Sequence, residues 1–374
     1  MIKIIGVGDI MPGGILNGCK KDFISKDVQE ILCSADLKIG TLETAVGNEP
    51  NFYDEKMKRL ADVIYVEDQD IERIKQLSFD VLSLANNHFF DLGPEGAKHA
   101  IDLLDKKGIA HVGAGCNIEE AAKPVIKVIN GKSFAILGFC DWRDETVGWC
   151  PIASETTPGV NPMYDDYAAK EIKKYKKLYD YIVVVNHWGK EYDYYPTSHV
   201  FHTTKKMIDA GADLILGGHT HCVQPIMKYK GKSVIFSMGN FLFPDRLIVK
   251  PRSTFYANTL IDVTKLPVTD GYPKVEELTY KIWKPIARIG MITETYFDEN
   301  LINTGVKYIK LSDDNYIDLT NLPITTEKKL HFIEKQLNSG VYEQIRIIVN
   351  FSIFIWHLPK RVLRKISRIL CGSK

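Results

Sequence analysis

Two histidines, His219 and His221, stand one residue apart at the end of the apolar stretch that begins at Asp213. A short apolar run bounded by glycine predicts a buried strand, and Gly217 and Gly218 allow the backbone to turn where that strand stops. Two imidazoles placed in this way can face one small volume, which would suit a metal ion. A lone His-x-His pattern is more often two hydrogen-bonded loop residues, so the prediction depends on which other groups converge there.

Four more apolar strands end in side chains that can bind metals or move protons. In chain order these strands end at Asp9, at Glu43, at Asn87 with His88, and at His187. Helical segments between the strands predict sheets whose carboxyl ends form one face. Each strand end taken alone is typical of a helix cap or a solvated residue. Five strand ends of the same design favour a shared site.

The collected side chains supply two carboxylates, one carboxamide oxygen and three or four imidazoles. A set of nitrogen and oxygen donors without thiolates suits Mn²⁺, Fe or Zn²⁺. Six candidate ligands are too many for one tetrahedral ion, so we predict two ions with one carboxylate bridging them. Such a pair can hold a hydroxide and neutralise the entering and leaving oxygens of a displacement. Phosphoester hydrolysis is the reaction class that most often needs this arrangement.

The same strand ends carry motifs that resemble the CapA family of poly-γ-glutamate capsule-synthesis proteins, a branch of the calcineurin-like metallophosphoesterases. The resemblance covers roughly residues 1–245, and its motifs are Gly8–Met11, Leu42–Glu43, Leu84–His88, Asn186–Tyr192, Gly218–His221 and Ser237–Phe241. It implies an α/β fold of two stacked mixed β-sheets flanked by helices, a four-layer metallophosphatase-like sandwich. A C-terminal helical tail follows in this chain.

By position, the resemblance implies two ligand sets that share Glu43 as the bridge: Asp9, Glu43 and His221 for one ion, and Glu43, Asn87, His187 and His219 for the other. Two positions depart from ordinary phosphoesterases. Met11 stands where their Asp-x-His motif has its histidine, and Glu43 replaces their bridging aspartate. Because a thioether is a poor ligand for a hard dication, the first site loses a donor. Both departures are usual for the CapA branch and indicate divergent chemistry.

The resemblance also implies residues beyond the metal ligands. His88 corresponds to the catalytic histidine that protonates the leaving group or steadies developing charge. Asp91 would orient the His88 imidazole or, equally, cap the helix that follows. The residues expected to contact substrate are Asn86, Trp188, Lys190 and Glu191.

Composition limits the remaining functions. The chain has 374 residues and a net charge of +1, which predicts no nucleic-acid partner. Its seven cysteines have no regular spacing and are expected to be reduced thiols. The N-terminus reads as a strand without a signal segment, and no apolar stretch approaches the ~20 residues of a membrane helix. We therefore expect a cytoplasmic protein.

The expected domains are a metallophosphatase-like unit over residues 1–262, a β-rich completion over 263–335 and a helical tail over 336–374. In the tail, Ile347–Leu358 is mainly apolar, and basic residues alternate with apolar ones from Lys360 onward. We favour docking of residues 345–374 on the inner membrane face or on a capsule-synthesis complex. The alternative is a helix packed on the domain.

The leading hypothesis is a metal-dependent, phosphoesterase-like hydrolase that acts on a small-molecule or polymer substrate in bacterial capsule or surface-polymer biosynthesis. A second hypothesis keeps the metals but assigns them a γ-glutamyl amide substrate, as a hydrolase or transferase. A third describes a non-catalytic accessory subunit of a membrane polymer synthase. The sequence has no feature that separates the phosphoester from the amide.

Overall fold

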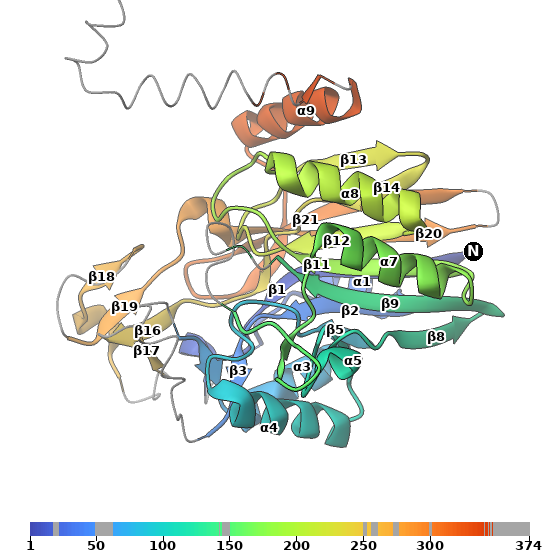
Figure 1. Ribbon diagram of the computed structural model, residues 1–374. Helices are drawn as coiled ribbons and strands as arrows, with labels where there is room; N and C mark the ends of the chain where they lie inside the picture. The colour runs from blue at the N-terminus through green and yellow to red at the C-terminus, as the bar shows by residue number, and fades with distance from the viewer. Residues whose placement is uncertain are drawn as a thin grey trace, which may run out of the picture.

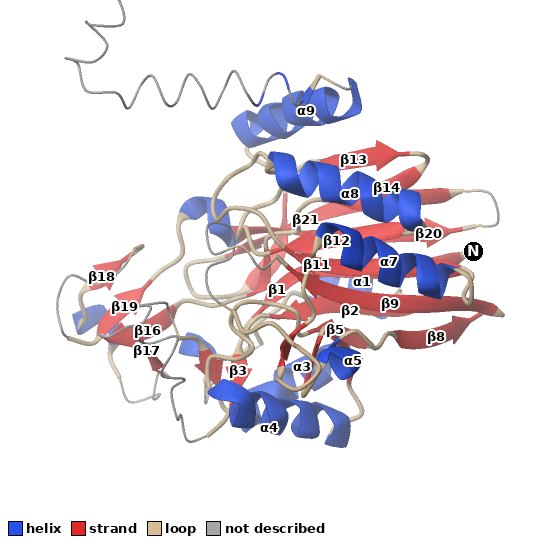
Figure 2. Ribbon diagram, in the orientation of Figure 1, coloured by secondary structure: helices blue, strands red, loops and turns tan. Residues whose placement is uncertain are grey.

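Two β-sheets lie face to face between two layers of helices (Figures 1 and 2). The computed structural model describes residues 1–17, 22–48, 63–141, 143, 150–249, 253–255, 261–271, 277–298, 301–339, 341, 342, 344 and 346. The predicted fold class, stacked mixed sheets flanked by helices, is confirmed by this architecture.

The larger sheet has eight strands in the order β22-β21-β20-β1-β2-β5-β6, with β15 also paired to β1. Its centre is parallel: β1 pairs in parallel with β2 and β15, and β5 with β2 and β6. The later strands extend it in antiparallel fashion from β1. The bounds are β1 Ile2–Ile10, β2 Leu37–Leu42, β5 Val81–Ser83, β6 Ala110–Val112, β15 Asn240–Leu242, β20 Ile289–Phe297, β21 Ile302–Leu311 and β22 Ile317–Thr320.

The smaller of the two stacked sheets has six strands in the order β13-β14-β12-β11-β9-β8. Strands β9, β11, β12 and β14 run parallel, and the hairpins β8–β9 and β13–β14 close its two edges. Asn130 and Gly131 both have positive φ at the β8–β9 turn, the backbone conformation that a type I′ Asn-Gly hairpin turn requires. The bounds are β8 Val125–Ile129, β9 Lys132–Cys140, β11 Tyr181–His187, β12 Leu214–Gly218, β13 Ile226–Tyr229 and β14 Lys232–Ile235.

The helices cover the outer faces of the two sheets. Their starts follow from local chemistry: the side chain of Ser25 accepts from the N–H of Val28 at the first helix, and Pro94 lies in the first turn of α4. Gly211 ends α8 in a left-handed conformation at φ +119°. The bounds are α1 Lys26–Cys33, α3 Ile71–Leu77, α4 Gly93–Lys106, α5 Ile118–Ala121, α7 Asp165–Lys176, α8 Ser198–Ala210 and α9 Ile324–Ser339.

Successive side chains of a strand point to opposite faces of its sheet, and both faces of these strands are covered. This explains why the strands are continuous apolar runs in the sequence. In β1, Ile4 joins the apolar cluster between the two sheets, whereas Ile5 joins the cluster beneath α1, α3 and α4. In β11, Val183 faces the other sheet and Val184 faces α7 and α8. Both faces of these strands are therefore buried, and each such side chain contributes about 1.5–3 kcal/mol.

Smaller sheets flank the sandwich. A four-stranded sheet, at the left of Figure 1, has the order β17-β16-β19-β18. Two-stranded pairs join β3 to β4 and β7 to β10. The bounds are β3 Ala45–Val46, β4 Tyr65–Val66, β7 Ala114–Gly115, β10 Gly159–Val160, β16 Arg246–Val249, β17 Ser253–Phe255, β18 Val268–Thr269 and β19 Thr279–Lys281.

The C-terminal third continues the sandwich. Strands β20, β21 and β22 belong to the larger sheet, and α9 lies beside β13 and α8 (Figure 1). Ile333 and Leu337 of α9 join the apolar cluster between the six-stranded sheet and the helices α7 and α8, which we call the helix-side core. Apart from Arg346, the tail segment 345–374 lies outside the described residues, so its docking role stays a prediction. Among the helices that the structure describes, none is long and apolar enough to cross a bilayer.

Candidate metal centre

Four strands from the two stacked sheets bring their carboxyl ends to one place. Asp9 lies near the end of β1, and Glu43 directly follows β2 in the larger sheet. His187 is the last residue of β11, and His219 directly follows β12 in the smaller sheet. The pairing register of β1 shifts next to Asp9 on both of its parallel partners. A local irregularity of this kind re-aims a side chain relative to the regular strand.

One group of side chains centres on His187. Its Nε2 atom lies 2.8 Å from Asn87 Oδ1 and 3.3 Å from Glu43 Oε1. The Nδ1 atom of His219 lies 3.1 Å from the same His187 nitrogen. Glu43, His187 and His219 form a buried set whose ligand atoms all lie within 4.8 Å of one another. That spacing allows one ion to contact all three.

A second group shares the Glu43 carboxylate. The Nε2 atom of His221 lies 3.8 Å from Glu43 Oε1, and its Nδ1 atom lies 3.9 Å from Asp9 Oδ2. Asp9, Glu43 and His221 also keep their ligand atoms within 4.8 Å of one another, and all three are buried. Asp9 and His187 connect the groups, because Asp9 Oδ1 lies 3.8 Å from His187 Nδ1. The six predicted ligands are therefore brought together, and these buried groups could hold metal ions.

The electrostatics of these groups fit a bound cation. Burial, together with the nearby Glu43 carboxylate, raises the pKa of Asp9 well above its usual range, against a hydrogen bond from the His219 backbone N–H. Burial and the charge of His221 hold the pKa of His187 well below its usual range. Asp9 Oδ1 and His187 Nδ1 have no hydrogen-bond partner among the described residues. A divalent ion would favour ionised Asp9 and neutral His187 and would satisfy such atoms.

The glycines before His219 permit close approach rather than a turn, which corrects the sequence-based expectation. Both lie inside β12, and a Cβ on Gly217 would come within 2.0 Å of the Phe236 carbonyl oxygen. A Cβ on Gly218 would come within 2.4 Å of Asp9 Oδ1. The left-handed backbone instead belongs to the histidines, with φ +86° at His219 and +51° at His221. Such strain, of order 1–3 kcal/mol per residue, occurs mainly at functional sites.

His88 and Asp91 form a buried pair beside the metal-binding groups. His88 donates from Nδ1 to Asp91 Oδ2 at 2.7 Å, and the same oxygen accepts from the Ile64 N–H at 2.6 Å. Asp91 does not cap α4, whose N-cap position is Leu92 without a side-chain cap. Of the two roles considered for Asp91, the geometry therefore favours orienting the imidazole. With Nδ1 as the donor, Nε2 is the nitrogen available for proton transfer.

The four residues expected to contact substrate separate into two pairs. Trp188 is fully buried in the helix-side core and donates from its indole N–H to the Phe236 carbonyl at 2.7 Å, so we correct its substrate role. Asn86 is fully buried too, donating to the Leu42 carbonyl and accepting from the His88 N–H, so it positions the loop that carries Asn87 and His88. Lys190 and Glu191 are exposed, and their substrate contacts stay a prediction.

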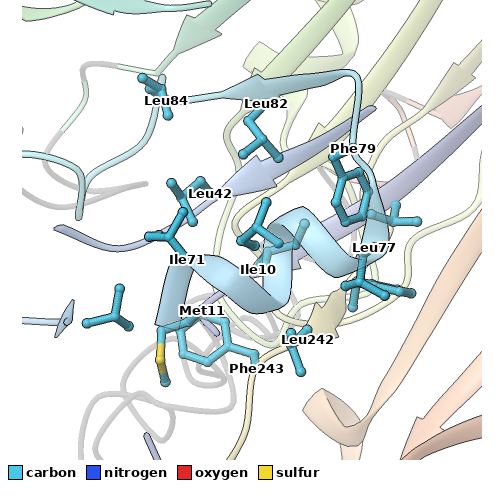
Figure 3. Close-up of a cluster of buried hydrophobic side chains, with 14 of the residues drawn as sticks. Ile10, Met11, Leu42, Ile71, Leu77, Phe79, Leu82, Leu84, Leu242 and Phe243 are labelled. Carbon is cyan, nitrogen blue, oxygen red and sulfur yellow. The ribbon is translucent and has the colours of Figure 1, made fainter. Parts of the chain in front are cut away.

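Met11 takes no part in the candidate site. It is fully buried in the cluster beneath α3, where it lies among apolar side chains that include Ile71 and Phe243 (Figure 3). The position therefore packs the core, in agreement with the poor match between a thioether and a hard dication.

Three residues beside His221 had no predicted role. Asn240, the register partner of Asp9 in β15, places Oδ1 2.9 Å from His221 Nδ1 and so can fix the ring. Asn240 begins β15 and does not end a strand, so the strand-end design did not identify it, although it lies in the Ser237–Phe241 motif. The rings of Tyr192 and Trp283 lie 6.1 Å and 4.8 Å from the His221 ring. Trp283 lies after residue 262, outside the expected metallophosphatase-like unit.

Comparison with known proteins identifies the family that this chain matches. The family described as "Bacterial capsule synthesis protein PGA_cap" matches residues 3–245. The "Capsule biosynthesis protein CapA" of Bacillus anthracis is 33% identical over 286 residues, covering 72% of this chain and 68% of that protein. The "PGA biosynthesis protein CapA" of Bacillus subtilis is 34% identical over 242 residues, covering 63% and 62%. A "Probable polyglutamine synthesis accessory protein" of Mycobacterium tuberculosis is 27% identical over 216 residues, 55% of each chain.

Proposed function

Because the chain belongs to the bacterial capsule synthesis family PGA_cap, we propose that it is a metal-dependent hydrolase of phosphoesters in capsule or poly-glutamate production. The observation that carries the proposal is the pair of buried ligand groups that share the Glu43 carboxylate. One carboxylate common to two groups can bridge two ions, and the donor atoms suit Mn²⁺, Fe or Zn²⁺.

In this proposal the six residues hold two divalent ions: Asp9, Glu43 and His221 one, and Glu43, Asn87, His187 and His219 the other. The bound ions would supply an activated water and neutralise charge on the leaving oxygen. His88 would give its proton from Nε2 to the leaving group, while Asp91, fully buried, keeps the Nδ1 proton in place and stabilises the imidazolium. The backbone N–H of His219 holds Asp9 Oδ2 at 2.9 Å, leaving Oδ1 for an ion.

A second candidate is hydrolysis or transfer of a γ-glutamyl amide at the same site. The observation that favours it is the name of the Bacillus subtilis relative, a PGA biosynthesis protein. The same metals could polarise an amide carbonyl, and His88 could protonate the leaving nitrogen. The two candidates differ in substrate and share every residue.

The test combines metal content with a substrate panel. We expect the purified protein to hold close to two divalent ions and to hydrolyse a phosphomonoester, a phosphodiester or a γ-linked glutamate oligomer. Asn87→Ala and His219→Ala each remove a ligand of one ion and should lower both metal content and turnover. His331→Ala is the matched control, because its side chain is 64% exposed on α9.

Two results would contradict the proposal. Full turnover in both ligand variants would remove the site assignment. A metal-loaded wild-type protein without turnover on any of the three substrate types would instead favour a non-catalytic accessory role. Cleavage of the γ-linked oligomer alone would select the amide candidate over the phosphoester.

A further inference from the structure

A buried cationic pair lies in the four-stranded sheet. Arg246 on β16 and Lys281 on β19 face each other as register partners, and they are only 4% and 7% exposed. Arginine and lysine are almost never buried to this extent unless a counter-charge or a ligand meets them. This sheet contributes none of the six predicted metal ligands. Lys281 has an anionic neighbour in Glu191, whose pKa its charge helps to lower, so the buried charge that needs an explanation is the Arg246 guanidinium.

Arg246 packs against aromatic faces, and none of the described carboxylates forms an ion pair with it. Its guanidinium carbon lies 4.5 Å from the centre of the Trp283 ring and 5.4 Å from that of Phe243. Within the described part of the chain, its Nη1 atom has no hydrogen-bond partner, and the side chain forms no ion pair. Stacking restricts the fork to one orientation while leaving an N–H donor unused.

The adjacent carboxylate is already committed elsewhere. Asp245 accepts two hydrogen bonds from Arg288, at 2.7 Å and 3.0 Å, and one from the Trp283 backbone N–H at 2.9 Å. The Tyr280 hydroxyl also donates to it, at 3.1 Å. Arg288 is thereby neutralised within the protein, whereas no carboxylate of the described residues pairs with Arg246, next in sequence to the same aspartate. The unused donor of Arg246 is left for a group from outside the chain.

This guanidinium lies on the flank of the candidate metal centre. The Trp283 ring that it covers is 4.8 Å from the His221 ring, so one indole separates Arg246 from a predicted metal ligand. A further cation is on the same flank: Lys284 Nζ lies 4.2 Å from the Tyr192 ring, which in turn lies 6.1 Å from the His221 ring. Three cations therefore gather on the side of the site formed by β16, β19 and the segment that follows β19.

We propose that Arg246, with Lys281 as its register partner and Lys284 on the same flank of the site, binds an oxyanion of the substrate one group away from the bond that is cleaved. The ligand is a carboxylate or a phosphate, because a planar guanidinium matches either with two parallel hydrogen bonds. This subsite rests on the proposed function for its neighbour, the reacting group at the metals. It assigns the substrate a second negative charge, as a polymer of glutamate or a phosphorylated precursor carries.

The test measures equilibrium binding, which does not require turnover. Inorganic phosphate and a γ-linked glutamate trimer are titrated calorimetrically into the metal-loaded protein. Arg246→Gln should raise the Kd of at least one probe by about 10- to 100-fold, the effect of losing a charge-assisted hydrogen-bonded pair. Lys265→Gln removes a charge from a side chain that is 81% exposed and should leave both values unchanged. The probe that responds identifies the oxyanion.

Arg246→Lys separates a loss of binding from a folding defect, because it keeps the buried charge but loses the planar guanidinium. It should weaken binding as well, with wild-type metal content and circular dichroism. The inference is overturned if wild-type protein binds neither probe, or if both Arg246 variants bind both probes within twofold of wild type. Absence of turnover with a Kd that depends on Arg246 would sink the hydrolase proposal and keep the subsite.

Discussion

Substitution of Gly218 by alanine tests the candidate metal centre through a single added methyl group. The new Cβ would stand 2.4 Å from Asp9 Oδ1, well inside the 3.0 Å below which real Cβ contacts are essentially never found. Gly218 is held on β12 as the register partner of His187, so the Asp9 carboxylate has to move. Metal–ligand distances tolerate only about 0.2 Å, which is less than the displacement needed.

Two magnitudes follow from this clash. Overpacking of a well-packed site costs about 1–3 kcal/mol of the free energy of unfolding. Misplacing one ligand should weaken metal binding by about 10- to 100-fold, the range observed when groups that orient metal ligands are changed. Urea denaturation of the metal-free protein measures the first, and titration with Mn²⁺ or Zn²⁺, checked by elemental analysis, measures the second.

Two other glycines separate these effects. Gly6→Ala places a Cβ 2.7 Å from Thr293 Oγ1 and 2.9 Å from Leu216 Cδ1, so it should destabilise the inter-sheet core without changing metal affinity. Gly305→Ala in β21 meets nothing closer than 4.0 Å and should be near neutral in both assays. Wild-type metal affinity in Gly218→Ala, or an equal loss of affinity in Gly6→Ala, would refute the reasoning.

Three further predictions concern individual side chains. His88→Gln should lower kcat by about 10²- to 10⁴-fold with unchanged metal content, since it removes a proton donor and not a ligand; loss of metal would argue against this role. The raised pKa of Asp9 makes the metal-free protein lose stability as pH rises from the ordinary value of 3.8 through the folded-state pKa. Asp9→Asn removes that loss, so in urea denaturation the variant should become more stable than metal-free wild type by an amount that grows from pH 4 to pH 7. Added metal should not change the stability of the variant. A stability difference that is independent of pH would contradict the assignment. Trp188→Phe leaves the buried Phe236 carbonyl without its indole donor and should lower the free energy of unfolding by about 1–3 kcal/mol. The KM should stay unchanged. A raised KM at full stability would instead support a substrate contact of Trp188.

Local patterns were enough to predict the elements that build the site. The apolar runs at Ile2–Val7 and Tyr181–Val185 predict strands buried on both faces, because alternate side chains of each strand meet different cores. A polar residue that ends such a run lies at the carboxyl edge of the sheet. The candidate ligands could therefore be identified without knowing how the sheets stack, since each follows a strand that is recognisable from its apolar residues.

Other features of the site depend on contacts between segments far apart in the chain. Trp188 directly follows the strand end at His187, yet its ring belongs to the helix-side core, because successive residues point to opposite faces. Gly218 is required by the Asp9 carboxylate of the other sheet, and no local pattern records that approach. Trp283 and Arg246 reach the flank of His221 from a sheet that lies outside the repeated strand design.

The amino-acid pattern was enough to predict the strands that lead into the site, their burial on both faces and the polar groups at their ends. Those properties depend on side-chain alternation and turn residues within a few positions of each other. Three features became visible in the three-dimensional structure alone: Glu43 is shared by two ligand groups, Asp91 contacts His88 and does not cap α4, and Arg246 has an unused donor. The sharing of Glu43 depends on how the two stacked sheets meet, and the unused donor of Arg246 depends on its packing against Trp283. The His88–Asp91 contact depends on a loop conformation in which Asp91 also accepts from the Ile64 N–H.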